Sequence, residues 1–452
     1  MAKGATRDMT VGSPMKHILG FTLPLLFGFL FQQFYGIVDT IIVGRFLGVN
    51  ALAGVGSTGS VNFMTIGFCC GVCSGFAIPV AQKFGAGDYE GMRRNVANCV
   101  WLSIIFSVLM TVIVVILCDE ILIWTDTPSD IFQAAYDYIL IIFIGIPTVY
   151  LYNMLSGILR SMGNSKVPLI FLLLSSVLNI ILDLVCIITF QMGVAGAAIA
   201  TVASQLISGV LCLIYIVKRY EILHISKEEW KPDLHYMKIL CSMGVPMGLQ
   251  YSITAIGSVI MQTALNGLGA MAVAATTAAN KVSMFFGCPF DAMGTTMATY
   301  GGQNVGAKKI ERIGQGLRAC LTVGFVYWVI SFIVMCIFGE RLNALFVDSP
   351  DPEMMAQAQE FLLINGASFF LLALVNIVRY LIQGMGYSTF AILAGVFELV
   401  ARTLAAIVLV PLFGFTGACF ASPLAWVFAD AFLIPAYFHV KKKLERIMLQ
   451  EA

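Results

Sequence analysis

Long apolar stretches limit most strongly what this chain can fold into. From about residue 17 to the C-terminal tail they recur with only short hydrophilic breaks between them. A helix needs about 20 mostly apolar residues to cross the hydrocarbon core of a bilayer. Only 11% of the residues are charged, against roughly 25% in soluble domains. The chain is therefore predicted to be an all-α integral membrane protein.

The hydropathy pattern predicts twelve transmembrane helices. They lie near residues 17–43, 53–80, 96–118, 132–158, 167–189, 194–217, 239–265, 271–300, 317–338, 357–382, 389–411 and 415–438.

Basic residues predict the orientation of these spans. With the N-terminus inside, 22 of the 26 Lys and Arg residues fall in inside segments, Arg379 among them, and only Arg45 and Arg341 fall in outside loops. Basic loops stay on the cytoplasmic side of a membrane. We therefore expect a multi-pass protein of the plasma membrane with both termini in the cytoplasm.

The chain also repeats itself. Arg45-Phe-Leu-Gly-Val-Asn-Ala-Leu-Ala matches Asn266-Gly-Leu-Gly-Ala-Met-Ala-Val-Ala at a shift of 221 residues. Gln82-Lys-Phe-Gly-Ala matches Gln303-Asn-Val-Gly-Ala at the same shift, and Asn153 pairs with Asn376 at 223. These matches keep their order along the chain. They predict an N-lobe of residues 1–217 with spans 1–6, a cytoplasmic linker at 218–238, and a C-lobe of residues 239–452 with spans 7–12.

Six spans in each half keep both halves in the same orientation. The two six-helix bundles are therefore predicted to be related by a pseudo-two-fold axis along the membrane normal, with a cavity between them. This arrangement is more typical of a transporter than of a purely structural membrane protein.

Two acids lie deep within predicted spans of the first half. Asp39 lies in span 1 and Asp183 in span 5, with Asn179 one helical turn before Asp183 on the same face. A charged side chain at mid-membrane costs about 2.5–3.5 kcal/mol on insertion scales. Two nearby acids repel when both are ionised, which suits a site that binds and releases a cation. The structural alternative is a pair of carboxyl groups that stabilise the bundle through hydrogen bonds.

The second half has other polar residues within spans. Glu398 and Arg402 stand four residues apart in span 11, so they are expected to neutralise each other, and a transport role is an equal alternative. Lys281 and Asp291, both in span 8, are candidates for lining a cavity of the C-lobe. The repeat places Arg402 opposite Asn179 and Ala406 opposite Asp183, so the two halves are expected to have divided their labour.

The sequence does not favour an enzyme. A membrane enzyme would need a cluster of His, Ser or metal-binding side chains. The four histidines, His17, His224, His235 and His439, all lie near the predicted cytoplasmic surface. No cofactor or bound metal is expected beyond a coupling cation, and the net charge of +1 gives no reason to expect a nucleic-acid partner.

Over nearly its full length the chain resembles the multidrug and toxic compound extrusion (MATE) family. The resemblance rests on the string Val38-Asp-Thr-Ile-Ile-Val-Gly-Arg-Phe-Leu-Gly and on the two Gln-x-x-Gly-Ala elements after spans 2 and 8. Leu159-Arg-Ser-Met-Gly-Asn-Ser-Lys-Val-Pro and Gly193-Val-Ala-Gly-Ala-Ala add to it. It implies an antiporter that exports amphipathic, often cationic, drugs or metabolites by alternating access, driven by inward H⁺ or Na⁺.

The resemblance also implies a cation-coupling site in the N-lobe. Family members with such a site use polar residues of spans 1, 5 and 6, and the matching positions here are Gln32, Asp39, Asn179, Asp183 and Thr201. Of these, Asp39, Asp183 and Asn179 are the candidates for Na⁺ ligands, although H⁺ is the favoured ion. Some branches carry a span-7 acid eight residues past the proline. Thr254 stands there in this chain, so that C-lobe site is expected to be absent or altered.

A lipid-linked precursor flippase of the same superfamily is the second transporter interpretation. Such proteins often carry more basic residues within spans and sometimes have extra spans. By this assignment only Lys281 and Arg402 lie within spans here, so export of small molecules is favoured.

The topology is tested by cysteines introduced one at a time. Cysteines at positions 126 and 348 should react from outside intact cells with a membrane-impermeant thiol reagent, and a cysteine at 229 should not, because basic residues keep the linker in the cytoplasm. Reaction at 229 in intact cells would contradict the assignment.

Overall fold

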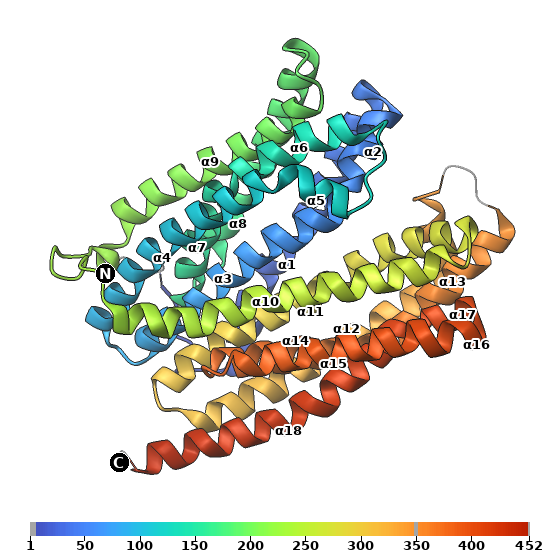
Figure 1. Ribbon diagram of the computed structural model, residues 1–452. Coiled ribbons are helices and arrows are strands. Elements are labelled where there is room, and N and C mark those ends of the chain that lie inside the picture. The colour runs from blue at the N-terminus through green and yellow to red at the C-terminus, as the bar shows by residue number, and fades with distance from the viewer. Residues whose placement is uncertain (1–5, 348–350, 451–452) are drawn as a thin grey trace. The chain divides into compact units, whose positions relative to one another are not determined.

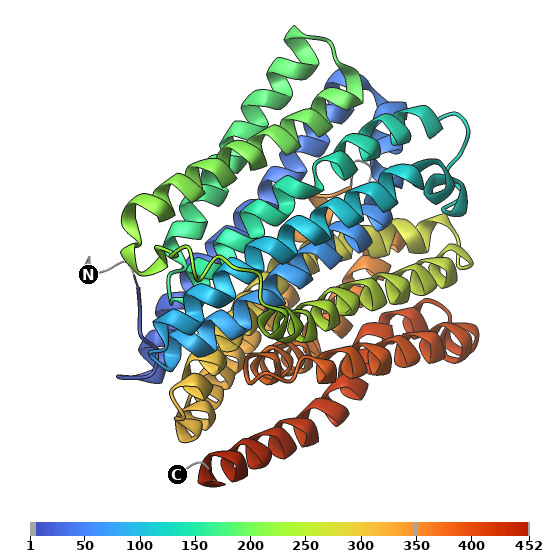
Figure 2. The ribbon, with the colours of Figure 1, turned by 60° about the vertical axis from the view of Figure 1, so that its left-hand side comes forward.

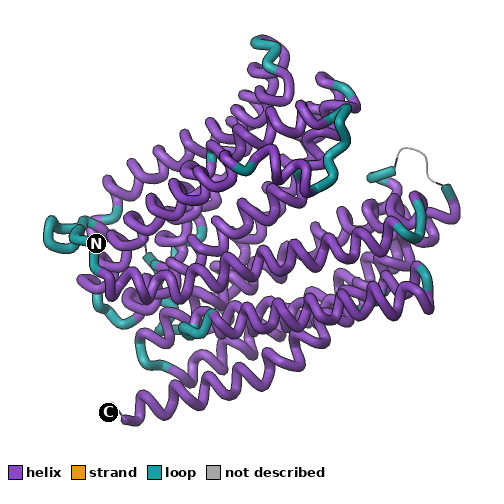
Figure 3. Tube along the Cα trace, viewed as in Figure 1, coloured by secondary structure: helices purple, strands orange, loops and turns teal. Residues whose placement is uncertain are grey.

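The computed structural model describes residues 6–347 and 351–450, and within these ranges the chain consists of helices joined by short loops and contains no strand (Figure 3). Position 348, one of the two outside labelling positions, lies outside the described residues. Among the described residues, nine helices are long and apolar enough to cross a membrane, and two bent helix pairs pass the same test together. Helix α11 occupies the place of the remaining predicted span, 271–300. The prediction of an all-α membrane fold with twelve spans is confirmed.

The chain forms two compact units, each with its own core. Unit 1 comprises residues up to Asp8 together with Phe27–Ser252, and unit 2 comprises Met9–Leu26 together with Ile253–Ala452.

Most of the first half of the chain lies in unit 1. Figure 1 shows its helices, and Figure 2 shows α8 and α9 running side by side. The elements are α1 (Pro14–Leu47), α2 (Val49–Ser57), α3 (Gly59–Gly85), α4 (Tyr89–Ile116), α5 (Cys118–Trp124), α6 (Phe132–Ile144), α7 (Ile146–Ser161), α8 (Lys166–Leu184), η1 (Val185–Thr189), α9 (Gly193–Arg219), η2 (Glu221–Leu223) and α10 (Leu234–Asn266).

Unit 2 contains the later helices, among which α11 packs along α14, and α15 packs along α18. Its elements are α11 (Ala270–Gly306), α12 (Ile310–Ala344), α13 (Pro352–Ala367), α14 (Phe369–Gly384), α15 (Thr389–Leu404), η3 (Ala405–Leu409), α16 (Val410–Phe413), α17 (Phe415–Cys419) and α18 (Ala421–Gln450).

The repeat is visible in the helices themselves. The pair α6–α7 in unit 1 and the pair α13–α14 in unit 2 each bend by 47° at a break. Pro147 follows the first break, where its ring lacks a donor N–H. At the second break Ser368 Oγ donates to the carbonyl of Ile364, a side-chain bond that often bends helices. Helices α8 and α15 each continue into a five-residue π-helical segment, η1 and η3.

The compact units differ from the two halves of the repeat in helices α1 and α10. The first turns of α1 pack in unit 2, where Thr22 Oγ1 lies 2.8 Å from Thr296 Oγ1. The first part of α10, as far as Ser252, packs in unit 1. At 34 and 33 residues these two helices are longer than one bilayer crossing needs. Each therefore has enough length to pack in both units.

Glycines allow α10 to approach α3 closely within unit 1. A Cβ at Gly71 would lie 2.5 Å from the carbonyl oxygen of Met247, and a Cβ at Gly75 would lie 2.5 Å from the Cα of Gly244. Real Cβ atoms do not approach other atoms so closely. The stripe of small residues Gly67, Gly71 and Gly75 on α3 is therefore a helix-packing face.

The linker between the repeat halves is docked on α4. Asp233 N donates to Asn98 Oδ1 at 2.9 Å, and Trp101 Nε1 donates to the carbonyl of Trp230 at 3.0 Å. Glu229, which is buried, accepts from Arg93 at 2.8 Å. The hydrogen bond from Arg93 lowers the pKa of Glu229 to about 2.

Replacing Glu229 with Gln is expected to loosen the linker. The change removes a hydrogen bond between charged groups, which is worth about 1.5–3 kcal/mol. Limited trypsin digestion of the purified protein should cut the linker faster in the variant than in the wild type. Glu228→Gln is the matched control, because Glu228 pairs with Lys231 where both side chains are exposed. Equal digestion rates for the two variants would contradict the docking role.

The same contact predicts how docking depends on pH. The folded pKa of Glu229 lies below its unfolded value of about 4.3, so its stabilisation is present above the unfolded value and is lost as pH falls through about 2. The digestion rate should therefore stay constant between about pH 5 and pH 8, once the protease's own pH dependence is subtracted.

Candidate functional site

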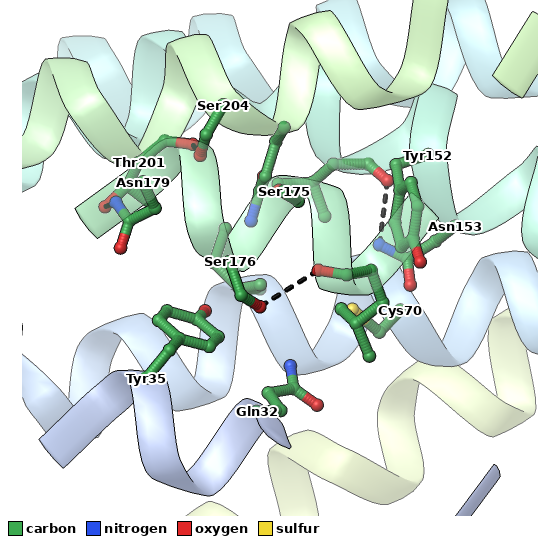
Figure 4. A pocket seen from close by; sticks show the side chains of 14 residues that line it. Gln32, Tyr35, Cys70, Tyr152, Asn153, Ser175, Ser176, Asn179, Thr201 and Ser204 are labelled. Carbon is green, nitrogen blue, oxygen red and sulfur yellow. Dashed lines mark hydrogen bonds between the residues drawn. The ribbon is translucent and has the colours of Figure 1, made fainter. Parts of the chain in front are cut away.

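A polar pocket lies within unit 1, between α1, α3, α7, α8 and α9 (Figure 4). Most of its lining side chains are uncharged hydrogen-bonding groups, and none is charged. It is lined by Gln32, Tyr35, Ile66, Cys70, Val149, Tyr152, Asn153, Leu172, Ser175, Ser176, Asn179, Thr201, Ser204 and Gln205. Such a pocket can hydrogen-bond a ligand from several sides without a fixed charge of its own.

Three of the five predicted cation-coupling residues line this pocket: Gln32, Asn179 and Thr201. Asn179 Nδ2 donates to Thr201 Oγ1 at 3.3 Å, across the packed pair α8 and α9. Figure 4 shows the two side chains next to each other at one end of the pocket. Ser175 also lines the pocket, four residues before Asn179. Sequence reasoning missed it, although its i, i+4 spacing on the face of Asn179 is a usable signal.

The other two predicted residues, Asp39 and Asp183, lie within electrostatic range of each other. Each lies one helical turn beyond a lining residue, Asp39 after Tyr35 on α1 and Asp183 after Asn179 on α8. Asp183 is fully buried. Among the described residues, three of their oxygens have no hydrogen-bond partner: both carboxylate oxygens of Asp183 and Oδ1 of Asp39. The structure therefore brings together the two acids that the sequence places in spans 1 and 5.

Two tyrosines flank the acid pair. Tyr35 from α1 and Tyr138 from α6 both lie within electrostatic range of Asp39 and Asp183. Sequence reasoning missed Tyr138, because it lies 99 residues after Asp39 and 45 residues before Asp183. No helical spacing rule applies at such separations. Tyr35 precedes Asp39 by four residues, so helical spacing is sufficient to find it.

The arrangement fits a small cation. Buried carboxylates without partners are costly unless a proton or another cation compensates them. Asn179 Oδ1 is also a buried oxygen without a partner among the described residues, so three side chains offer free oxygens. Oxygen donors suit hard cations such as Na⁺, and paired carboxyl groups can share a proton. No three His, Cys, Asp or Glu side chains gather into a metal site in the described part of the chain.

Unit 2 separates its predicted cavity residues. Asn376 Nδ2 donates to Asp291 Oδ1 at 2.9 Å. Lys281 is exposed, and its ammonium lies 5.8 Å from the centre of the Phe346 ring. Lys281 therefore contacts an aromatic ring rather than Asp291.

The main partner of Glu398 differs from the one expected. Arg379 on α14, buried, donates directly to Glu398 Oε1, whereas Arg402 Nη2 lies 3.7 Å from Glu398 Oε2. Arg379 is part of a spanning helix and not of an inside loop, so the count of inside basic residues falls by one. Glu398 makes this placement possible, because a paired guanidinium is tolerated within a span. The i, i+4 spacing identified the weaker of two partners.

Asp430 on α18 is a buried acid that the sequence analysis did not single out. Its carboxylate lies within electrostatic range of Arg379, and among the described residues neither of its oxygens has a hydrogen-bond partner. Arg379 therefore has two carboxylates in its surroundings, Glu398 and Asp430.

The chain is similar to a known protein family and to several of its individual members. The MatE family model matches residues 24–185 and 246–412. The probable multidrug resistance protein YoeA of Bacillus subtilis (strain 168) is 27% identical over 373 residues, which cover 81% of this chain and 80% of YoeA. The multidrug export protein MepA of Staphylococcus haemolyticus (strain JCSC1435) is 24% identical, with 90% of this chain and 89% of MepA covered.

Solved structures show the same fold. The outward-facing conformation of a multidrug resistance MATE family transporter of the MOP superfamily matches with a TM-score of 0.91 and 22% identity, over 99% of this chain and all of that chain. A crystal structure of MATE in complex with MaL6 gives the same values. At this identity the likeness extends to the arrangement of helices and not to the residues of a site.

The buried pair Arg379–Glu398 is expected to carry stability. Arg379→Met leaves Glu398 without its main partner, and breaking a buried ion pair costs about 3–5 kcal/mol. The thermal unfolding temperature in detergent and the expression level should both fall. Arg402→Met should have a smaller effect, because Arg402 is the more distant partner. The double variant Arg379→Met, Glu398→Gln should recover much of the loss. A double variant no more stable than Arg379→Met alone would refute the pairing.

Proposed function

Because the chain belongs to the MATE family of membrane transporters, we propose that it is a cation-coupled antiporter that exports amphipathic, often cationic, drugs or metabolites across the plasma membrane. Similar proteins are named as multidrug resistance and multidrug export proteins, which favours export over the flipping of lipid-linked precursors. Both termini would lie in the cytoplasm, as the basic residues predict.

The observation that carries the coupling proposal is the acid pair Asp39 and Asp183 beside a neutral pocket. Uphill export requires that substrate affinity depend on cation occupancy, and this coupling is a free energy shared by both ligands. Asn179 lies in the pocket lining and is one turn from Asp183 on α8. A change of cation occupancy at the acids therefore acts on a side chain that a substrate in the pocket would touch.

Alternating access completes the proposal. An external cation binds at Asp39 and Asp183, substrate leaves the pocket, and the transporter returns to the cytoplasmic side, where the cation dissociates. We favour H⁺ over Na⁺, because two neighbouring carboxyl groups can share one proton without further ligands. Na⁺ would need several oxygen ligands around it, of which Asp39, Asp183 and Asn179 supply three.

Asp39→Asn and Asp183→Asn keep the side-chain shape and remove the charge. Each should abolish uphill efflux of a cationic dye in everted vesicles while the protein level stays near normal. Asp137→Asn is the matched control, because the carboxylate of this acid on α6 already accepts a hydrogen bond from Gln133 at 2.7 Å. Wild-type efflux by the double variant Asp39→Asn, Asp183→Asn would refute the coupling site.

The identity of the cation is tested with the purified protein in liposomes. Under an imposed pH gradient without Na⁺, dye transport should proceed, and a Na⁺ gradient at equal pH should not drive it. The reverse outcome would assign Na⁺ to Asp39, Asp183 and Asn179.

A further inference from the structure

Residues that line the pocket of unit 1 have internal counterparts in unit 2 through the repeat. The alignment of the two halves is given by two residue pairs: Gln82 on α3 with Gln303 on α11 at a shift of 221, and Asn153 on α7 with Asn376 on α14 at a shift of 223. Helices α8 and α15 begin at positions related by the same shift of 223, Lys166 and Thr389, and run unbroken beyond the residues compared. The pocket residues Cys70, Asn153, Ser175 and Asn179 thereby correspond to Asp291, Asn376, Glu398 and Arg402, which we call the counterpart residues.

Unit 2 brings members of this set together as unit 1 does. Asn376 and Asp291 share a hydrogen bond of 2.9 Å, just as Asn153 and Cys70 line one pocket. Helix α15 also lies against α10 within unit 2, because a Cβ at Gly257 would be 3.1 Å from Arg402 Nη1. The counterpart residues differ from the unit 1 set in charge. Where unit 1 has a thiol, a hydroxyl and two amides, unit 2 has two carboxylates, an amide and a guanidinium.

Among these charges, Arg402 is the least satisfied. The carboxylate of Glu398 is engaged by Arg379, and Arg402 reaches only its other oxygen, at 3.7 Å. The structure gives Arg402 no other hydrogen bond or ion pair among the described residues. Its side chain is 13% exposed, and none of its nitrogens is a fully buried atom without a partner. A guanidinium has five N–H donors in a planar fork, so most donors of this partly buried side chain have no protein partner.

We propose that unit 2 holds a second ligand-binding position at the counterpart residues, in which Arg402 binds a carboxylate of the transported molecule. The preferred substrates would then include amphipathic molecules that carry a carboxylate as well as an apolar or cationic part. This inference rests on the proposed export function and names a substrate class for it. The planar fork of a guanidinium matches the two oxygens of a carboxylate.

Glu398 sets the strength of this position. As the carboxylate already nearest to Arg402, it competes with an incoming carboxylate for the same donors. Because Glu398 pairs more closely with Arg379 than with Arg402, the guanidinium of Arg402 stays available to a ligand carboxylate. Removing the charge of Glu398 should therefore strengthen binding of a carboxylate ligand, and removing the charge of Arg402 should weaken it.

The test uses two dyes that differ only in the group at issue: a rhodamine with a free carboxylate and its methyl ester. Binding to the purified full-length protein is measured by fluorescence polarisation at neutral pH. The wild type should bind the free acid more tightly than the ester. Arg402→Gln should weaken binding of the acid by about tenfold to hundredfold, the range expected for a hydrogen bond between charged groups, and leave binding of the ester nearly unchanged.

Two further variants distinguish a lost ligand contact from a misfolded protein. Glu398→Gln should tighten binding of the acid and not of the ester, an opposite change that a misfolded protein would not produce. Arg341→Gln, in the exposed last turn of α12, is the matched control for loss of a positive charge in unit 2, and should change neither affinity.

The outcomes distinguish the two proposals. Equal binding of both dyes to the wild type, or an equal loss of both in Arg402→Gln, would overturn the carboxylate position and leave the exporter proposal intact. If neither dye bound the wild type, both proposals would be contradicted. If an anionic phospholipid added to the micelles displaced the acid but not the ester, and did so at a lower concentration than the acid itself needs, a lipid headgroup would be the ligand of Arg402, and the proposal would be wrong.

Discussion

An ionised carboxylate inside a bilayer must have a proton, a cation or hydrogen-bond donors beside it, because the hydrocarbon core supplies none of these. The two units meet this requirement differently. In unit 1 the acids Asp39 and Asp183 face each other, and among the described residues Asp183 has no donor at all. In unit 2 Glu398 lies between Arg379 and Arg402. The first arrangement needs a proton or another cation as its partner, whereas the second has a built-in cation in Arg379.

This difference explains why coupling and structure are expected in different places. A site that must be empty and filled in turn cannot contain a permanent counter-charge, since the counter-charge would remove the reason for a cation to bind. In the described part of the chain, no basic side chain acts on the Asp39–Asp183 pair as such a counter-charge. Glu398 is paired with the buried guanidinium of Arg379, so it connects α14 and α15 within unit 2. It is poorly suited to bind and release a cation.

The sequence was sufficient for the parts of the fold that depend on local or periodic signals. Apolar length gave the twelve spans, and in-order matches such as Gln82 with Gln303 gave the duplication. Helical spacing placed Asn179 and Asp183 on one face, and the structure adds Asp39 to them. The sequence did not identify Arg379 as the main partner of Glu398, because the two lie on successive helices at a separation of 19 residues, where no spacing rule applies. Tyr138 escaped for the same reason. The packing of α1 and α10 in both units depends on contacts such as Thr22 with Thr296, far apart in sequence.

The duplication gives the site its asymmetry. Two copies of one six-helix plan place corresponding residues on equivalent helices, and the bent pairs α6–α7 and α13–α14 show the common plan. Substitution at a few lining positions then changes the chemistry without changing the packing, since Asn179 and Arg402 each occupy the same place on equivalent helices. The neutral pocket of unit 1 lies beside two acids that have no permanent counter-charge, so its ligand affinity can depend on a bound cation. The guanidinium of Arg402 in the other copy is permanently charged and cannot take that role. The two copies thus offer different chemistry, a neutral polar pocket in one and a guanidinium in the other, which is a physical reason for one chain to keep both.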